Sequence, residues 1–377
     1  MPRLKPSIST GKAAVLALTL ACAACVSTAP RVSDPGLPAV DEGEADPAPW
    51  WSKAGDPVLA QVIGQGLAHD AALACSAWQL QGDAARMDAH RRHLGGRLAS
   101  LMKKPAVPQG PAAGAYSHAD LVNSRAADMA GAYLGVRLAQ ARLAARRAAV
   151  APWQDNTEIA RFRREAGLVS AIDSSLGGVM VDLDADAVAQ AQADVNQQIA
   201  RLASQTGLAA DALAALVGEG GGVPTLSDLA AQPPRRAALM ALRQQQAQAV
   251  LDGRTSADDA RVALDNARTA SDQAIDRAAK TLAMARDRVE ASARSLAQAE
   301  RTVRDARSGY RAGAETFATL YVAEASALAA AEADAAARAS LAQAQVQLWA
   351  AQGLGWTTAD LALPTSAQAA SPCPAQP

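Results

Sequence analysis

The stretch "YRAGAETFATLY" at residues 310–321 decides the fold, because its glycine separates two runs that otherwise carry an unbroken helical pattern. The stretch "RREAGLVSAIDS" at residues 163–174 repeats the same Ala-Gly step. In both stretches a hydroxyl follows the glycine by three residues, as Ser170 and Thr316. Glycine lets a chain reverse without a clash at Cβ, and the hydroxyl can cap the returning helix. Gly167 and Gly313 lie 146 residues apart, which predicts two copies of one helical hairpin.

The run before the second glycine carries a heptad pattern. Large residues recur every seven positions at Ile275, Leu282, Val289, Leu296, Val303 and Tyr310, and small ones at Ala278, Ala285, Ser292, Ala299 and Ala306. This alternation is typical of a coiled coil whose helices approach closely. At 1.5 Å per residue, a helix over 256–308 is about 75 to 80 Å long. Residues 316–352 keep the register in Ala323, Ala330, Ala337, Ala344 and Ala351, with Tyr321, Leu328 and Trp349 on a neighbouring stripe.

The fold class expected from these patterns is all-α and elongated, with long antiparallel helical hairpins, internally duplicated and packed as coiled coils. Asp56 and Pro57 indicate a helix start, and further helices are expected over about 70–101, from near His118 to 166 with a kink at Pro152, and over 171–206 and 235–251. The predicted organisation is a signal peptide (1–25), a Pro-rich acidic linker (26–49), a first helical repeat (50–217), a loop (218–234), a second helical repeat (235–363) and a disordered tail (364–377).

Composition and charge narrow the class of protein. Hydrophobic residues make up 50% of the chain, but aromatic residues only 3%, and alanine supplies much of the apolar content. Such a composition favours closely packed helices over a thick globular core. The 36 basic and 37 acidic side chains are interspersed and give a formal net charge of -1, which argues against nucleic acid as the principal partner.

The N-terminal segment predicts export from the cytoplasm. A basic start precedes the apolar run "AAVLALTLACAA" at 13–24, which has the length of a signal peptide. The following Cys25 matches the lipid-acceptor cysteine of a bacterial lipoprotein signal, which would carry acyl chains such as palmitate. Cys22 is a rival acceptor, and cleavage without lipid is a third alternative.

The remaining candidate sites argue against catalysis. Cys75 and Cys373 are too far apart in sequence to indicate a disulfide framework, and we interpret them as one buried small residue and one tail residue. His90 and His93 could share a metal, but Arg91 and Arg92 between them favour a solvated basic helix face. The "GEGGG" at 218–222 lacks the Gly-Lys-Ser/Thr of a phosphate loop. We therefore expect no enzyme activity, no metal and no cofactor.

Both ends of the repeated region resemble the TolC/NodT family of outer-membrane efflux factors. The resemblance rests on "WWSKAGDPVLAQVIGQGLAHDAAL" at 50–73, on the run from 310 to 356, and on its ending "GLGW" at 353–356, and it extends over about 50–356. It implies a trimer whose helical hairpins build a periplasmic tunnel and whose strands complete an outer-membrane β-barrel. It also implies a lipid-anchored place at the outer membrane of a Gram-negative bacterium, facing the periplasm, with a periplasmic adaptor and an inner-membrane pump as partners.

The sequence departs from that family in two places. The family has a strand hairpin in each half, but this chain offers only the Pro/Gly loop at 103–116 and a short break at 252–256, without the alternating ten-residue segments that membrane strands need. We expect the strand hairpins to be missing. Family members also carry acidic gating residues after the second tip, and the equivalent positions here are Thr319 and Val322.

Two functions remain open on these grounds. In the first, the protein is an efflux-assembly component whose tips dock the adaptor, through Gly167, Leu168, Ser170, Gly313, Glu315 and Thr316. The alternative is that these residues only form hairpin turns. Tight turns need the same residue types, so the sequence alone does not separate the two roles. In the second, the protein is a lipid-anchored periplasmic scaffold or regulator without channel activity, which assembles as a homotrimer or with full-length relatives.

Overall fold

The structure, a computed structural model, describes residues 36–40, 48–92, 112–169, 171–229, 232–362 and 372–373. The expectations for the signal peptide, for Cys22, Cys25 and Ser170, and for a metal site that would need His93 lie outside these residues.

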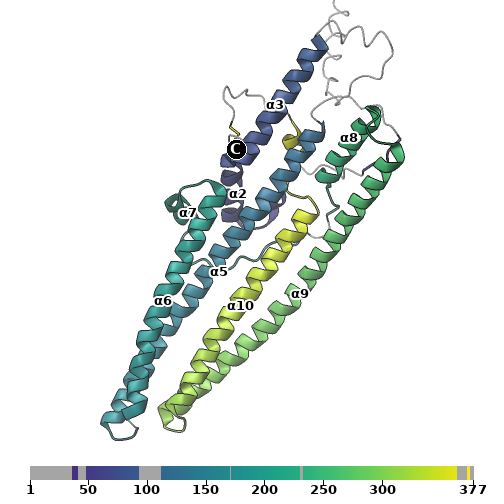
Figure 1. Ribbon diagram of the computed structural model, residues 1–377. Helices are drawn as coiled ribbons and strands as arrows, with labels where there is room; N and C mark the ends of the chain where they lie inside the picture. Colours follow the sequence, from purple (N-terminus) through teal and green to yellow (C-terminus); the bar gives the residue numbers. More distant parts are fainter. Residues whose placement is uncertain are drawn as a thin grey trace, which may run out of the picture.

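Two long helical hairpins lie side by side and make up most of the molecule (Figure 1). The first joins α5 (Ala112–Glu165) to α6 (Ala171–Thr206), and the second joins α9 (Ala257–Ala312) to α10 (Phe317–Ala351). Their turns lie at the same end of the molecule, and α10 packs against both α9 and α5. The elongated, duplicated, all-α fold predicted from the sequence is therefore confirmed.

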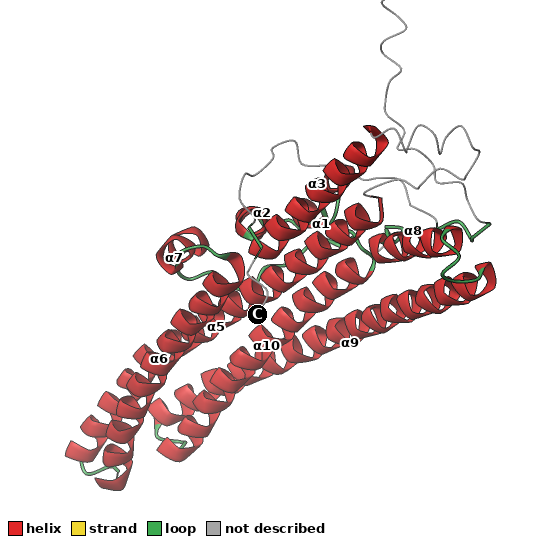
Figure 2. Cartoon of the chain, turned by 45° about the horizontal axis from the view of Figure 1, so that its top comes forward, coloured by secondary structure: helices red, strands yellow, loops and turns green. Residues whose placement is uncertain are grey.

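Shorter elements gather towards the end opposite the tips. They are α1 (Trp50–Lys53), α2 (Pro57–His69), α3 (Ala71–Arg92), α7 (Ala210–Val217), α8 (Ala237–Leu251) and the 3-10 turn η1 (Thr358–Leu361). Helix α2 begins as predicted, because the Asp56 carboxylate accepts hydrogen bonds from the backbone N–H groups of Val58 and Leu59. Every regular element among the described residues is helical, as Figure 2 shows.

The predicted absence of strand hairpins agrees with the described part of the chain. Residues 252–256 form a tight turn between α8 and α9, so no strand interrupts the second half there. In the first half, residues 93–111 lie outside the described range, and helix α5 already begins at Ala112. This start is earlier than the predicted one near His118. Gly114 packs so closely against Leu80 of α3 that a Cβ would lie 2.6 Å from a Leu80 methyl carbon, and the surrounding alanines are strong helix formers.

The heptad pattern of α9 is the seam of the second hairpin, as predicted. Every large or small seam residue between Ile275 and Tyr310 is buried or half-buried, whereas most of the residues between them are exposed. Leu282 and Ala285 pack with Ala344 and Leu348 of α10. Nearer the tip, a second cluster joins the two hairpins and consists of Ala160, Val303, Ala306, Tyr310, Phe317, Leu320 and Ala323.

The two ends of the repeated region meet in one core. Trp50 is 1% exposed, its ring centroid lies 5.2 Å from that of Trp349, and its backbone N–H donates to the Leu354 carbonyl. Gly353 has a positive φ of 72°, and a Cβ there would lie 1.9 Å from the Arg235 carbonyl oxygen. The two motifs on which the family resemblance rests therefore contact each other, and they close the bundle opposite the tips.

The interpretation of Cys75 and Cys373 as unpaired residues was wrong, because the two form a disulfide with their Cα atoms 4.6 Å apart. The two cysteines are 298 residues apart, so no local sequence pattern indicated that they meet. After α10, η1 packs against α5, and Cys373 is bonded to Cys75 of α3. The structure describes only Pro372 and Cys373 of the tail, and its disorder stays a prediction.

The tip glycines give a matched pair of stability predictions. Gly313→Ala should lower the free energy of unfolding by about 1 to 2 kcal/mol, because Gly313 has a φ of 79° that residues with a Cβ disfavour. Gly64→Ala should raise it by about 0.5 to 1 kcal/mol, because Gly64 lies inside α2 with open space at its Cβ position. Chemical denaturation measures both changes. Equal effects of the two substitutions would contradict the left-handed tip.

Candidate functional site

The first tip is a helix end closed by a glycine in the left-handed conformation. Helix α5 ends at Glu165, and Gly167 has a φ of 71°. The Leu168 N–H donates to the Arg163 carbonyl at 2.8 Å, and the Gly167 N–H donates to the Arg164 carbonyl at 2.9 Å. These bonds satisfy the last carbonyls of the helix. The Leu168 side chain is left 69% exposed at the extremity of the molecule.

The second tip has the same construction and a complete cap on its returning helix. The Ala314 N–H donates to the Gly309 carbonyl at 2.9 Å, which closes α9. The Thr316 hydroxyl accepts from the Thr319 N–H at 3.2 Å, which caps α10 as the sequence predicted. Glu315 and Thr316 are exposed, and so are both gate-equivalent positions, Thr319 and Val322. The geometry of the turns is thus confirmed, whereas the docking role of these residues stays a prediction.

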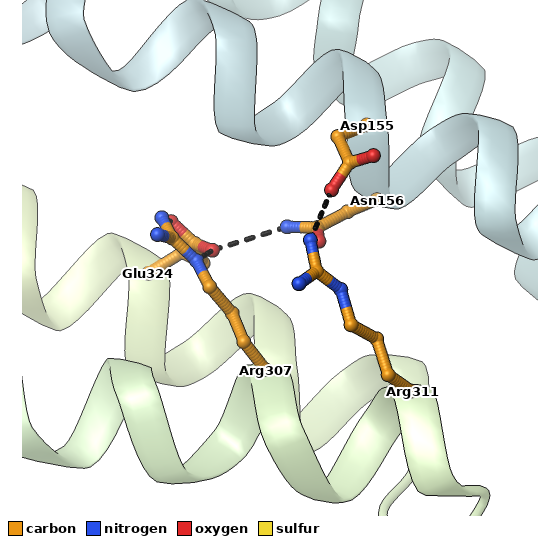
Figure 3. Close-up of polar contacts among 5 residues, drawn as sticks. All are labelled: Asp155, Asn156, Arg307, Arg311 and Glu324. Atoms are coloured by element: carbon orange, nitrogen blue, oxygen red, sulfur yellow. Dashed lines mark hydrogen bonds and ion pairs between the residues drawn. The ribbon is translucent and has the colours of Figure 1, made fainter.

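A buried ion pair lies just above the second tip (Figure 3). The Arg307 guanidinium donates to both carboxylate oxygens of Glu324, at 2.6 and 2.8 Å. The Glu324 side chain is only 5% exposed, and the Asn156 amide of α5 donates to it at 3.1 Å. The hydrogen bond to Glu324 raises the pKa of Arg307 above its usual value. Because Asn156 comes from the other hairpin, this network joins the two hairpins as well as the two helices of the second one.

Two further contacts tie the end of α5 to the second tip. Arg311 of α9 pairs with Asp155 at 2.6 Å, and both side chains are more than half exposed. The Arg163 guanidinium donates to the Tyr310 carbonyl at 2.8 Å and lies 4.9 Å from the centroid of the Tyr310 ring. The two tips are therefore held as one surface.

Sequence reasoning missed the Glu324 network because it looked for an acidic residue at the equivalent positions Thr319 and Val322. The acidic residue that follows the second tip is Glu324, two positions after Val322. Its carboxylate is neutralised by Arg307 of the same chain. One signal could have found the pair. Arg307 lies five residues before the last residue of α9 and Glu324 seven residues after the first residue of α10, so an antiparallel hairpin places them at similar heights.

An open groove of about 860 Å³ runs along the second hairpin above its tip. Small residues from both helices line it, among them Ala299 and Ala306 of α9 and Ala318 and Ala323 of α10, and Thr319 and Val322 lie on its wall. Small residues permit close approach of another helix. The gate-equivalent positions Thr319 and Val322 therefore line this open groove.

The described residues contain no group of three or more His, Cys, Asp or Glu side chains placed to hold a metal ion. None of the helices searched in that same part of the chain has the length and apolar character to cross a membrane.

Comparison with known proteins identifies the fold through structure alone. No protein-family model matches the sequence, and no curated protein matches it significantly. The outer-membrane channel OprN is similar in structure, with a TM-score of 0.66 at 17% identity over 86% of this chain and 98% of that one. The CmeC outer-membrane channel of Campylobacter jejuni gives 0.64 at 14% identity, over 87% and 95% of the two chains. The outer membrane protein VceC of Vibrio cholerae gives 0.59 at 17% identity, over 82% and 99%. The chain thus has the fold of these outer-membrane channel proteins.

The buried and the exposed ion pair give a second matched prediction. Arg307→Met should lower the free energy of unfolding by about 2 to 3 kcal/mol, because it leaves the buried Glu324 carboxylate without a cation. Arg311→Met, four residues nearer the tip in an exposed ion pair, should cost less than about 1 kcal/mol. The double variant Arg307→Met/Glu324→Met should recover part of the loss. Urea unfolding followed by circular dichroism tests the order, and an equal cost for both single variants would contradict it.

Proposed function

We propose that the protein is a component of a tripartite export assembly in the envelope of a Gram-negative bacterium. In this assembly its paired tips dock a periplasmic adaptor, which in turn meets an inner-membrane pump. The observation that carries the proposal is the pair of glycine tips, held as one surface at one end of an elongated bundle that has the fold of outer-membrane channel proteins.

The chemistry of the tips supports docking over a purely structural turn. Leu168 is 69% exposed and Phe162, one turn above the first tip, is 56% exposed. A turn needs the glycine and the cap, but it does not need large apolar side chains in water. We infer that these two apolar side chains belong to a surface that a partner covers. The proposed contact residues are Gly167, Leu168, Ser170, Gly313, Glu315 and Thr316.

Self-association into a homotrimer, or with full-length relatives, is supported by two complementary surfaces. Val179 and Leu183 of α6 are 53% and 54% exposed and lie about 12 and 18 Å above the first tip, at 1.5 Å per residue. On the second hairpin, the small-residue groove extends over about the same heights. The apolar side chains of one copy can therefore enter the groove of the next, in a head-to-tail contact of the kind that builds rings.

An envelope location is supported by two independent features. The first is the N-terminal signal segment, with lipid attachment at Cys25 or at the rival Cys22. The second is the Cys75–Cys373 disulfide, because disulfides persist in oxidising compartments such as the bacterial periplasm and are rare in the cytosol. We propose that the protein is anchored by its lipid to the outer membrane and faces the periplasm.

A second candidate function is a scaffold or regulator of the same assembly without channel activity. The short turn from α8 to α9 over residues 252–256 favours this scaffold function. A turn of this length cannot contain the strand hairpin that the resembled family has in each half. The two candidate functions can be distinguished by measuring drug extrusion after this protein is expressed in a strain that lacks its own tunnel protein. Restored extrusion supports the channel component, and adaptor binding without extrusion supports the scaffold.

Adaptor docking through the tips predicts a charge-sensitive contact. Leu168→Asp should weaken binding of a purified periplasmic adaptor at least about tenfold, because it places a carboxylate in the apolar contact. Val262→Asp is the matched control, because Val262 is 59% exposed but lies near the start of α9, far from the tips. Surface plasmon resonance with immobilised adaptor measures both. Equal binding by the two variants would argue that the tips are only turns.

Self-association predicts that a bulky side chain in the groove disrupts the oligomer. Thr302→Trp fills the groove from an exposed position outside the heptad seam and should shift the protein towards monomer, whereas Ala297→Trp, on an exposed face of the same helix, should not. Analytical ultracentrifugation gives the masses, and far-ultraviolet circular dichroism checks that both variants keep their helices. An unchanged oligomer in Thr302→Trp would show that the groove does not lie in the interface.

A further inference from the structure

The most weakly held long helix of the molecule is α3. Its described packing is against α5, through a single stripe of side chains. Leu73 and Leu80 are buried on this stripe, and the Ser76 hydroxyl between them hydrogen-bonds to the His118 imidazole at 3.0 Å. At the base of the helix, Asp70 pairs with Arg125 at 3.4 Å. No other element of the described structure contacts α3 extensively.

Cys75 lies on a different side of α3 from this stripe. With 100° per residue, its side chain is about 130° away from the mean direction of Leu73, Ser76 and Leu80. The disulfide therefore brings Cys373 against α3 on a side that α5 does not cover. Both cysteines are only partly buried among the described residues.

We propose that the Cys75–Cys373 disulfide is a redox-sensitive clamp, which holds α3 and the C-terminal residues on the bundle and releases both when it is reduced. The clamp connects the two extremes of the folded chain, since the cysteines are 298 residues apart. A crosslink over so long a loop restricts the unfolded chain strongly. Release leaves α3 to its packing against α5, while the α9–α10 hairpin keeps its full heptad seam.

The clamp is closed by thiol–disulfide exchange with an extracytoplasmic dithiol oxidase, the class of reaction that must act on this chain after export. The thiolate of one cysteine attacks the disulfide of the oxidase and forms a mixed disulfide, and the thiolate of the other cysteine then displaces the oxidase. The two cysteines lose two protons and two electrons, and the oxidase gains them as a dithiol. Reduction by a dithiol reductant is the reverse.

If lipid is attached at Cys25, the Cys75–Cys373 pair is the single disulfide that the mature chain can form. Cys22 would be removed with the signal peptide, and the Cys25 sulfur would be a thioether, so that Cys75 and Cys373 are the two thiols that remain of the four cysteines. The clamp itself does not depend on adaptor docking or on channel activity, and it can be tested without either.

The test is hydrogen–deuterium exchange of the mature full-length protein, oxidised and after treatment with dithiothreitol. Amides of α3 should exchange at least about tenfold faster after reduction, and by a larger factor than amides of the α9–α10 seam, which report global unfolding and serve as the internal reference. An equal factor in both regions would show only a global loss of stability and would overturn the local clamp. The variant Cys75→Ser/Cys373→Ser should exchange like the reduced protein and should not respond to dithiothreitol. Unchanged α3 exchange on reduction would overturn the clamp.

Thiol labelling keeps the proposal falsifiable if the double variant does not fold. A maleimide reagent that adds mass should label no cysteine of the unfolded, unreduced mature protein if Cys25 is lipidated, and two cysteines after reduction. Labelling of Cys75 and Cys373 without reduction would show that the bond does not form, and would also overturn the proposal.

Discussion

The packing of α10 against two helices at once is the contact on which the rest of the structure depends. Helix α10 faces α9 along the heptad seam and α5 along a second stripe, so it is buried on more than one side. Alanines make this possible, because Ala337, Ala342 and Ala344 give no bulk that would hold either neighbour away. Without the α10–α5 contact the two hairpins would be separate rods, and their tips would not form one surface.

Double-sided burial constrains the charged residues of α10. Glu324 and Asp334 are buried, and each is neutralised by an arginine and bound by a polar group from another helix. Glu324 takes Arg307 and Asn156, and Asp334 takes Arg338 and the hydroxyl of Ser292. A buried charge without such partners is costly, so these pairs stabilise one register of α10 between its neighbours. The alignment of the tips follows from that register.

The sequence predicts the parts of the structure that local chemistry governs. The heptads, the glycine turns and the Thr316 cap could be recognised because each depends on residues within a few turns of one another, and all were found in place. The Cys75–Cys373 bond, the Asn156–Glu324 contact and the early start of α5 could not, because each depends on which distant segments meet. Ser292 illustrates the limit. Its small size predicted a seam position, but the partner of its hydroxyl comes from 42 residues away.

The proposed function requires that this elongated bundle assembles through its tips. Native mass spectrometry of the mature protein, alone and mixed with a purified periplasmic adaptor that carries a helical hairpin, tests this requirement most directly. We expect a defined oligomer of this chain and a larger complex of fixed stoichiometry in the mixture. A monomer that stays a monomer in the presence of the adaptor at micromolar concentrations would contradict it.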